Sequence, residues 1–118
     1  KDMPAFVEQI KKWLKPGGVF FAAYQEGDVM PKTADETTTV LAKALRQNSL
    51  QYEVKNISLQ TYRMLKRKRE AALKYEKLFE NEGNKSWFDM LMWQTECITE
   101  PYEQFSAKMA RYIYTAKK

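Results

Sequence analysis

A five-residue segment near the start of the chain, Leu14-Lys15-Pro16-Gly17-Gly18, constrains the fold more than any other. A proline followed by two glycines cannot continue a helix, so the segment must end one element and begin another. The preceding residues 3–14 carry apolar side chains at helical spacing, and Asp2 can cap this helix. We expect the helix to bury the face formed by Phe6, Ile10, Trp13 and Leu14.

The segment is followed by the apolar run 19–24, Val-Phe-Phe-Ala-Ala-Tyr. β-Branched and aromatic residues behind two glycines favour a strand over a short buried helix. The run does not alternate with polar residues, which predicts a strand covered on both faces. Helix, turn and buried strand together form an α/β unit.

Two more strands and several helices are expected further along. Thr33 and Glu36 have capping-box spacing and predict a helix over about 35–48, which would bury Val40, Leu41, Ala44 and Leu45. Residues 52–57 and 111–116 alternate as strands do, and these two strands could pair antiparallel. Between them we expect a helical insert over about 60–109, with one helix over 61–82, a second capped by Ser86 and a third after Pro101.

The composition excludes several kinds of protein. The chain has no histidine, which rules out histidine metal sites and a Ser-His-Asp relay within these 118 residues. No apolar run is long enough for a membrane span, so we expect no membrane contact. The single cysteine, Cys97, suits a reducing, cytoplasmic setting and reads as a small buried residue.

The helix, the Lys-Pro-Gly-Gly turn and the apolar strand resemble class I S-adenosylmethionine-dependent methyltransferases. In that family this segment is the helix before the fifth strand of a seven-stranded Rossmann-like sheet. The resemblance extends to the later strands, with 52–57 as the sixth and 111–116 as an antiparallel seventh. The fold class implied is α/β: a partial methyltransferase sheet, strands five to seven, with a helical insert before the last strand and residues 1–118 forming the C-terminal half of one domain.

The resemblance implies methyl transfer from S-adenosylmethionine to a small acceptor. The family's glycine-rich cofactor loop has no counterpart here, so the cofactor would be bound mainly by residues upstream of Lys1 and the fragment alone would be inactive. The resemblance puts substrate contacts in the loop after the fifth strand, at Tyr24, Gln25, Glu26 and Asp28. Glu26 or Asp28 would be the possible base and Tyr24 a wall or hydrogen-bond donor, and an ordinary solvated loop is the other interpretation.

Aromatic and methionine side chains crowd the second insert helix, which carries both Trp87 and Trp93. These two tryptophans are candidates to line an acceptor pocket. Packing of the insert onto the sheet is the alternative, and the two roles are compatible. The sequence assigns no catalytic residue and no metal ligand.

A basic segment offers a different class of function. Residues 61–78 contain seven basic and two acidic side chains and carry the whole net charge of +5. A nucleic-acid-binding or non-catalytic interaction module using this helix is the alternative to the enzyme. We expect instead a solvated helix face with pairs such as Glu70–Lys74, and no nucleic-acid partner.

Strand 19–24 would have a parallel neighbour on its open side in the complete sheet. Without that neighbour the apolar edge should pair with another copy of the chain. We therefore expect either self-association through this edge or a longer chain whose first half supplies the missing neighbour.

Overall fold

The computed structural model describes residues 2–27 and 31–118. The chain divides into two units, a sheet unit formed by residues 1–57 and 109–118 and a helical unit formed by residues 58–108. The fold is mixed α/β. Within the described residues, no helix is long and apolar enough to cross a membrane.

A three-stranded sheet is the centre of the sheet unit, in the order β1-β3-β2. Its strands are β1 (Val19–Glu26), β2 (Gln51–Asn56) and β3 (Ala110–Lys117). β3 pairs antiparallel with both neighbours, from Val19↔Lys117 to Glu26↔Ala110 on one side and from Gln51↔Lys117 to Asn56↔Tyr112 on the other. The predicted antiparallel pairing of the second and last strands is therefore confirmed, and β1 is an edge strand.

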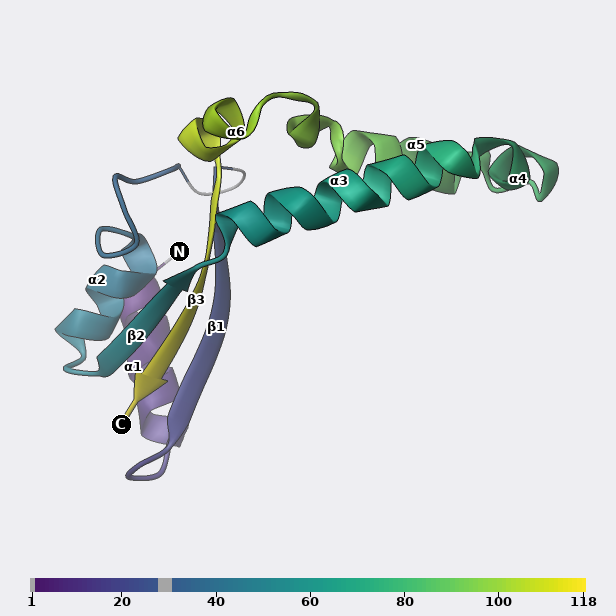
Figure 1. Cartoon of the computed structure of the whole chain (residues 1–118). Helices are drawn as coiled ribbons and strands as arrows, with labels where there is room; N and C mark the ends of the chain where they lie inside the picture. Colours follow the sequence, from purple (N-terminus) through teal and green to yellow (C-terminus); the bar gives the residue numbers. More distant parts are fainter. Residues whose placement is uncertain (1, 28–30) are drawn as a thin grey trace. The chain divides into compact units, whose positions relative to one another are not determined.

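Two helices, α1 (Met3–Trp13) and α2 (Val40–Gln47), pack on one another and share a core with one face of the sheet (Figure 1). Alternate residues of β3 are buried there: Ala110, Tyr112, Tyr114 and Ala116. The opposite face of β1 is open, with Val19 55% and Phe21 63% exposed. The prediction that this strand is covered on both faces is wrong, because both helices of the sheet unit lie on the same side.

Helix α1 begins as expected, with the Asp2 carboxylate accepting the Ala5 N–H at 3.1 Å. Its buried face differs from the prediction. Val7 is fully buried, whereas Phe6 and Trp13 are exposed. Val7 shares the core with the small residues Ala42 and Ala44 of α2, which leave room for close helix packing and rotate the larger aromatic residues outward.

Helix α2 starts five residues later than the capping-box pattern predicts. Thr39 is its N-cap and accepts the Ala42 N–H at 3.0 Å. Asp35 instead closes a local turn by accepting the Thr37 N–H at 2.7 Å. These local side-chain bonds compete with helix formation in the Thr37–Thr39 run. Val40 consequently lies outside the buried face, which is formed by Leu41, Ala42, Ala44 and Leu45.

The helical unit contains α3 (Ser58–Lys74), α4 (Glu76–Asn81), α5 (Lys85–Gln94), the 3₁₀ helix η1 (Glu96–Thr99) and α6 (Tyr102–Lys108). The single helix expected over 61–82 is broken at Tyr75, which allows Phe79 of α4 to pack on Phe88 of α5 with ring centroids 6.0 Å apart. Asn84 rather than Ser86 occupies the N-cap position of α5, without a side-chain hydrogen bond to the helix, and Asp89 pairs with Lys85 at 3.2 Å.

Candidate functional site

The carboxyl end of β1 brings Tyr24 and Glu26 to the same side of the sheet, because side chains two apart on a strand share a face. The register puts Tyr24 opposite Tyr112 and Glu26 opposite Ala110 of β3. Tyr24 also meets Tyr114 edge-on, with ring centroids 6.1 Å apart. A carboxylate and three phenol rings therefore gather beneath the helices of the sheet unit.

Glu26 is fully buried and anchors the chain that follows β1. Its Oε1 accepts the backbone N–H of Thr33 at 3.2 Å and the Thr33 hydroxyl at 2.9 Å. No lysine or arginine among the described residues comes within salt-bridge distance of this carboxylate. Its partners are thus neutral donors from one residue, and the bonds hold Thr33 against the end of the strand.

Tyr24 has a buried hydroxyl that makes no hydrogen bond to any described residue. Burial raises the pKa of Tyr24 above its ordinary value, and the nearby Glu26 carboxylate raises it further. The phenol therefore keeps its proton at neutral pH. A buried hydroxyl without a partner is unfavourable, so this proton is available to donate to a bound group.

The two tyrosines of β3 are also held neutral. Burial raises the pKa of Tyr112, with Glu26, Glu36 and Asp35 adding to the shift. Burial also raises the pKa of Tyr114 far above its ordinary value, against the opposing effect of the Thr39 hydrogen bond. The site therefore offers the Tyr24 phenol as a donor beside the Glu26 carboxylate as an acceptor, an arrangement that can orient a ligand carrying both kinds of polar group.

The structure joins only part of the predicted site. Gln25 points to the opposite face of β1, where its side-chain oxygen lies 3.4 Å from the Arg111 guanidinium. Asp28 lies outside the described residues. Trp87 and Trp93 belong to α5 of the helical unit and are 59% and 75% exposed, and their role in an acceptor pocket stays a prediction.

Sequence reasoning missed Thr33, Tyr112 and Tyr114 as parts of this site. The capping-box spacing predicts Thr33 as a helix cap, whereas in the structure its hydroxyl donates to Glu26 Oε1 at 2.9 Å. The sequence predicts that the alternating residues Tyr112 and Tyr114 belong to the last strand. Only the register shows that they face Tyr24 and Glu26.

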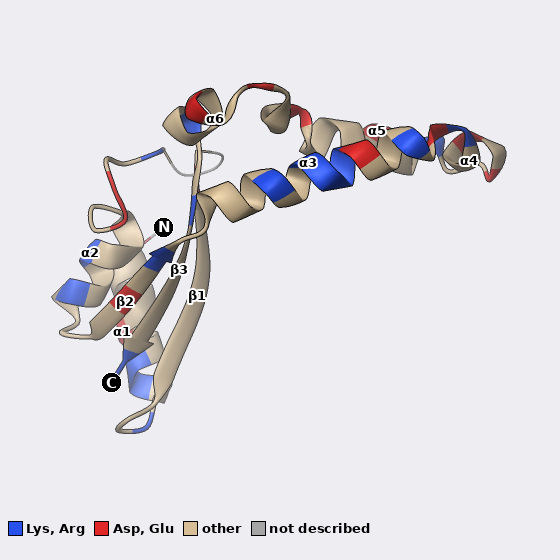
Figure 2. Cartoon of the chain, in the orientation of Figure 1, with Lys and Arg blue, Asp and Glu red and all other residues tan. Residues whose placement is uncertain are grey.

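Some basic side chains of α3 bind to α5, and others are exposed to solvent. Arg69 donates to the Met92 carbonyl at 3.0 Å and Lys68 to Gln94 Oε1 at 3.3 Å, so these two basic side chains tie α3 to α5. The expected Glu70–Lys74 ion pair is not formed, and Lys74 Nζ instead lies 5.4 Å from the centre of the Tyr75 ring. The remaining basic side chains are exposed along the helix (Figure 2), namely Arg63, Lys66 and Arg67.

The described part of the chain contains neither an activated cysteine nor a cluster of metal ligands. Burial raises the pKa of the Cys97 thiol, and Glu100 and Glu96 add to the shift, which disfavours the reactive thiolate. Within residues 2–27 and 31–118, no three cysteine or acidic side chains are grouped as metal ligands would be.

Comparison with known proteins gives no assignment: no protein-family model matches the sequence, and no curated protein is significantly similar to it.

Proposed function

We propose that this chain is part of an S-adenosylmethionine-dependent methyltransferase that methylates a small acceptor. The direction and order of the strands carry the proposal. β1 and β2 both run antiparallel to β3 and are therefore parallel to each other, with α2 in the connection between them. The resemblance implies this arrangement for strands five, six and seven of a Rossmann-like methyltransferase sheet, in which the last strand is the antiparallel one.

The site at the carboxyl end of β1 supports a role in holding the acceptor. Ligands of open α/β sheets bind at this edge. Tyr24 would donate a hydrogen bond to the acceptor, and Glu26 would take up a proton where the acceptor must lose one. The contribution of both residues is to orient the acceptor for attack, which is a large part of catalysis in transfer reactions.

We propose no contact with the cofactor among residues 1–118. The chain has four glycines, and three of them (Gly17, Gly18 and Gly83) lie in turns that end helices rather than in a glycine-rich loop between a strand and a helix. S-adenosylmethionine would supply the methyl group when bound. Its contacts are proposed for residues upstream of Lys1, and residues 1–118 alone are proposed to be inactive.

Calorimetric titration with S-adenosylmethionine tests this proposal. The product of the complete gene should bind the cofactor, and a fragment of residues 1–118 should not. In the complete protein, Tyr24→Phe and Glu26→Gln should leave cofactor binding within about twofold and lower the rate of methyl transfer about tenfold or more. A complete gene product that does not bind S-adenosylmethionine contradicts the proposal.

The single cysteine and the lack of an apolar spanning helix among the described residues fit a cytoplasmic enzyme, and we include this location in the proposal. A fluorescent fusion of the complete protein should fractionate with soluble cytoplasmic proteins. Recovery in a membrane or extracellular fraction would remove the location from the proposal.

A nucleic-acid-binding or interaction module remains the second candidate, because Arg63, Lys66 and Arg67 are exposed on α3 without an ion-pair partner among the described residues. Only part of the basic run is available, since Lys68 and Arg69 are bonded to α5. Binding of RNA or DNA that weakens steeply with salt would favour this candidate. Absence of binding at low salt would exclude it.

A further inference from the structure

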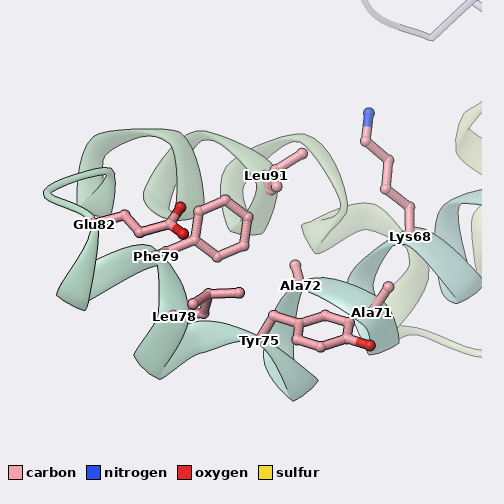
Figure 3. Close-up of a pocket in the computed structure, with 8 residues that line it drawn as sticks. All are labelled: Lys68, Ala71, Ala72, Tyr75, Leu78, Phe79, Glu82 and Leu91. Atoms are coloured by element: carbon pink, nitrogen blue, oxygen red, sulfur yellow. The ribbon is translucent and has the colours of Figure 1, made fainter.

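An open cavity of about 460 Å³ lies in the helical unit, between the C-terminal half of α3, α4 and α5 (Figure 3). Its volume is in the range of small-molecule sites. Most of its wall is apolar and is formed by Ala71, Ala72, Leu78, Phe79 and Leu91. The cavity is separate from the site at the end of β1, since all its lining residues belong to the helical unit.

The break between α3 and α4 creates this space. Tyr75 leaves helical geometry, which turns α4 away from the line of α3. Phe79 then packs on Phe88 and supports one wall from behind. On the other wall α3 presents the small methyl groups of Ala71 and Ala72, which leave the gap between the helices unfilled.

Two charged side chains mark its opposite ends. Lys68 lies at one end and Glu82 at the other, with the apolar wall between them (Figure 3). Lys68 Nζ makes one hydrogen bond, to Gln94 Oε1 at 3.3 Å, which leaves two of its three protons for another acceptor. Glu82 forms no ion pair within the described residues. The cavity is therefore positive at one end and negative at the other.

We propose that this cavity binds an amphipathic monocarboxylate, with its carboxylate on Lys68 and its hydrocarbon part along Ala72, Phe79 and Leu91. A charge-assisted hydrogen bond to the ammonium group fixes the acidic end. Glu82 repels a carboxylate and so prevents the reverse orientation. Burial of the hydrocarbon against the apolar wall supplies most of the affinity.

Calorimetric titration of the whole chain with decanoate, below its micelle concentration, tests the proposal. We expect one site per chain and weaker binding of decylammonium, which has the same tail and the opposite charge. Lys68→Gln should weaken decanoate binding about tenfold, as expected for the loss of one hydrogen bond to a charged group. Lys77→Gln removes the same charge from an exposed position outside the cavity lining and should change the affinity less than twofold.

A second pair of variants tests the location. Ala71→Leu keeps a strong helix former and fills the cavity, so it should abolish binding, while circular dichroism confirms that the helices persist. Glu82→Gln should strengthen decanoate binding. Equal effects of Lys68→Gln and Lys77→Gln, unchanged binding in Ala71→Leu, or preference for decylammonium would each overturn the proposal. Dimerisation that decanoate reverses would identify a second copy of the chain as the occupant and would overturn it as well.

Discussion

Tyr114 links three parts of the sheet unit through one buried hydroxyl. It donates its single proton to the Glu36 carbonyl. The Thr39 hydroxyl, 2.7 Å away, must therefore donate to Tyr114, while Thr39 also accepts the Ala42 N–H at the start of α2. The strand, the preceding turn and the helix cap thus form one satisfied chain of hydrogen bonds.

Tyr114→Phe should lower the free energy of unfolding by about 1–3 kcal/mol, because it leaves the Glu36 carbonyl and the buried Thr39 hydroxyl without their partner. Urea denaturation followed by circular dichroism measures the change. Tyr52→Phe is the matched control, since its hydroxyl bonds Arg46 at an exposed position. That control should cost less than about 0.5 kcal/mol. Equal losses in both variants would contradict this account of the buried network.

The raised pKa values of Tyr24, Tyr112 and Tyr114 predict how stability depends on alkaline pH. Each phenol is easier to ionise in the unfolded chain, where its pKa is about 10. Their contribution to stability is therefore complete below about pH 10 and is lost as pH rises toward the folded-state pKa values. Absorbance of tyrosinate should show these three ionising only as the protein unfolds. Ionisation of all seven tyrosines near pH 10 in the folded chain would contradict the prediction.

At the scale of the element, the Lys-Pro-Gly-Gly turn requires glycine at its two glycine positions for different physical reasons. Gly17 has φ +81° with open space around its Cα, so only its backbone conformation requires glycine. A Cβ on Gly18 would instead lie 2.8 Å from the backbone oxygen of Lys15. The turn is also tied to the last strand, because Gly17 N–H donates to the Lys118 carbonyl at 3.1 Å and Lys118 N–H to the Gly18 carbonyl at 3.0 Å.

These roles predict different tolerance at the two positions. Gly17→Ala should lower the free energy of unfolding by about 1–2 kcal/mol, and Gly17→Asn by less, because asparagine adopts positive φ more readily. Neither alanine nor asparagine should be tolerated at Gly18, where any Cβ meets the backbone. Urea denaturation of the four variants checks this. Recovery of stability in Gly18→Asn relative to Gly18→Ala would show that backbone conformation, not space, decides the position.

Elements were predictable from sequence where one local signal dominates. The turn at Pro16, the cap at Asp2 and the three strands each rest on such a signal, and the structure contains them. The start of α2 was predicted wrongly because local signals compete there. The capping-box pattern predicts a cap at Thr33, whereas Asp35 accepts the Thr37 N–H in a turn and Thr39 caps the helix by accepting the Ala42 N–H. The buried face of α1 depended on the size of side chains in α2, which the spacing of α1 does not reveal.

The same distinction applies to the candidate site. The resemblance pointed to Tyr24 and Glu26, which lie within the last three residues of β1 rather than in the loop after it. Tyr112 joins them through the strand register, and Thr33 joins them through a half-buried hydrogen bond to Glu26. Both depend on the tertiary structure, which local sequence patterns do not reveal.

At the scale of the whole molecule, the helical unit is an insertion between neighbouring strand ends. Asn56 pairs with Tyr112, and the Ile57 N–H donates to the Arg111 carbonyl at 2.9 Å, so the chain leaves and re-enters the sheet at adjacent positions. The pairing of the three strands therefore does not require residues 58–108, as long as a connection joins Ile57 to Met109. Each unit has its own aromatic and apolar contacts, such as Tyr62 with Tyr102 and Phe105 in the helical unit.

The two edges of the sheet differ in their protection against association. The outer strand β2 carries the charged residues Glu53 and Lys55, which discourage pairing with another strand. The other outer strand, β1, has no charge before Glu26 and exposes Val19 and Phe21 on its open face. An unprotected apolar strand with free backbone groups favours pairing with a second copy of itself.

The chain should therefore self-associate through β1, with a mass that rises with concentration in light scattering. Phe21→Lys should shift the protein toward monomer, because it removes an exposed apolar side chain and adds repulsion between copies. Gln51→Lys adds the same charge to an exposed position of β2 and should leave the association unchanged. A wild-type chain that is monomeric at every concentration, or equal effects of the two lysine variants, would show that the β1 edge does not drive association.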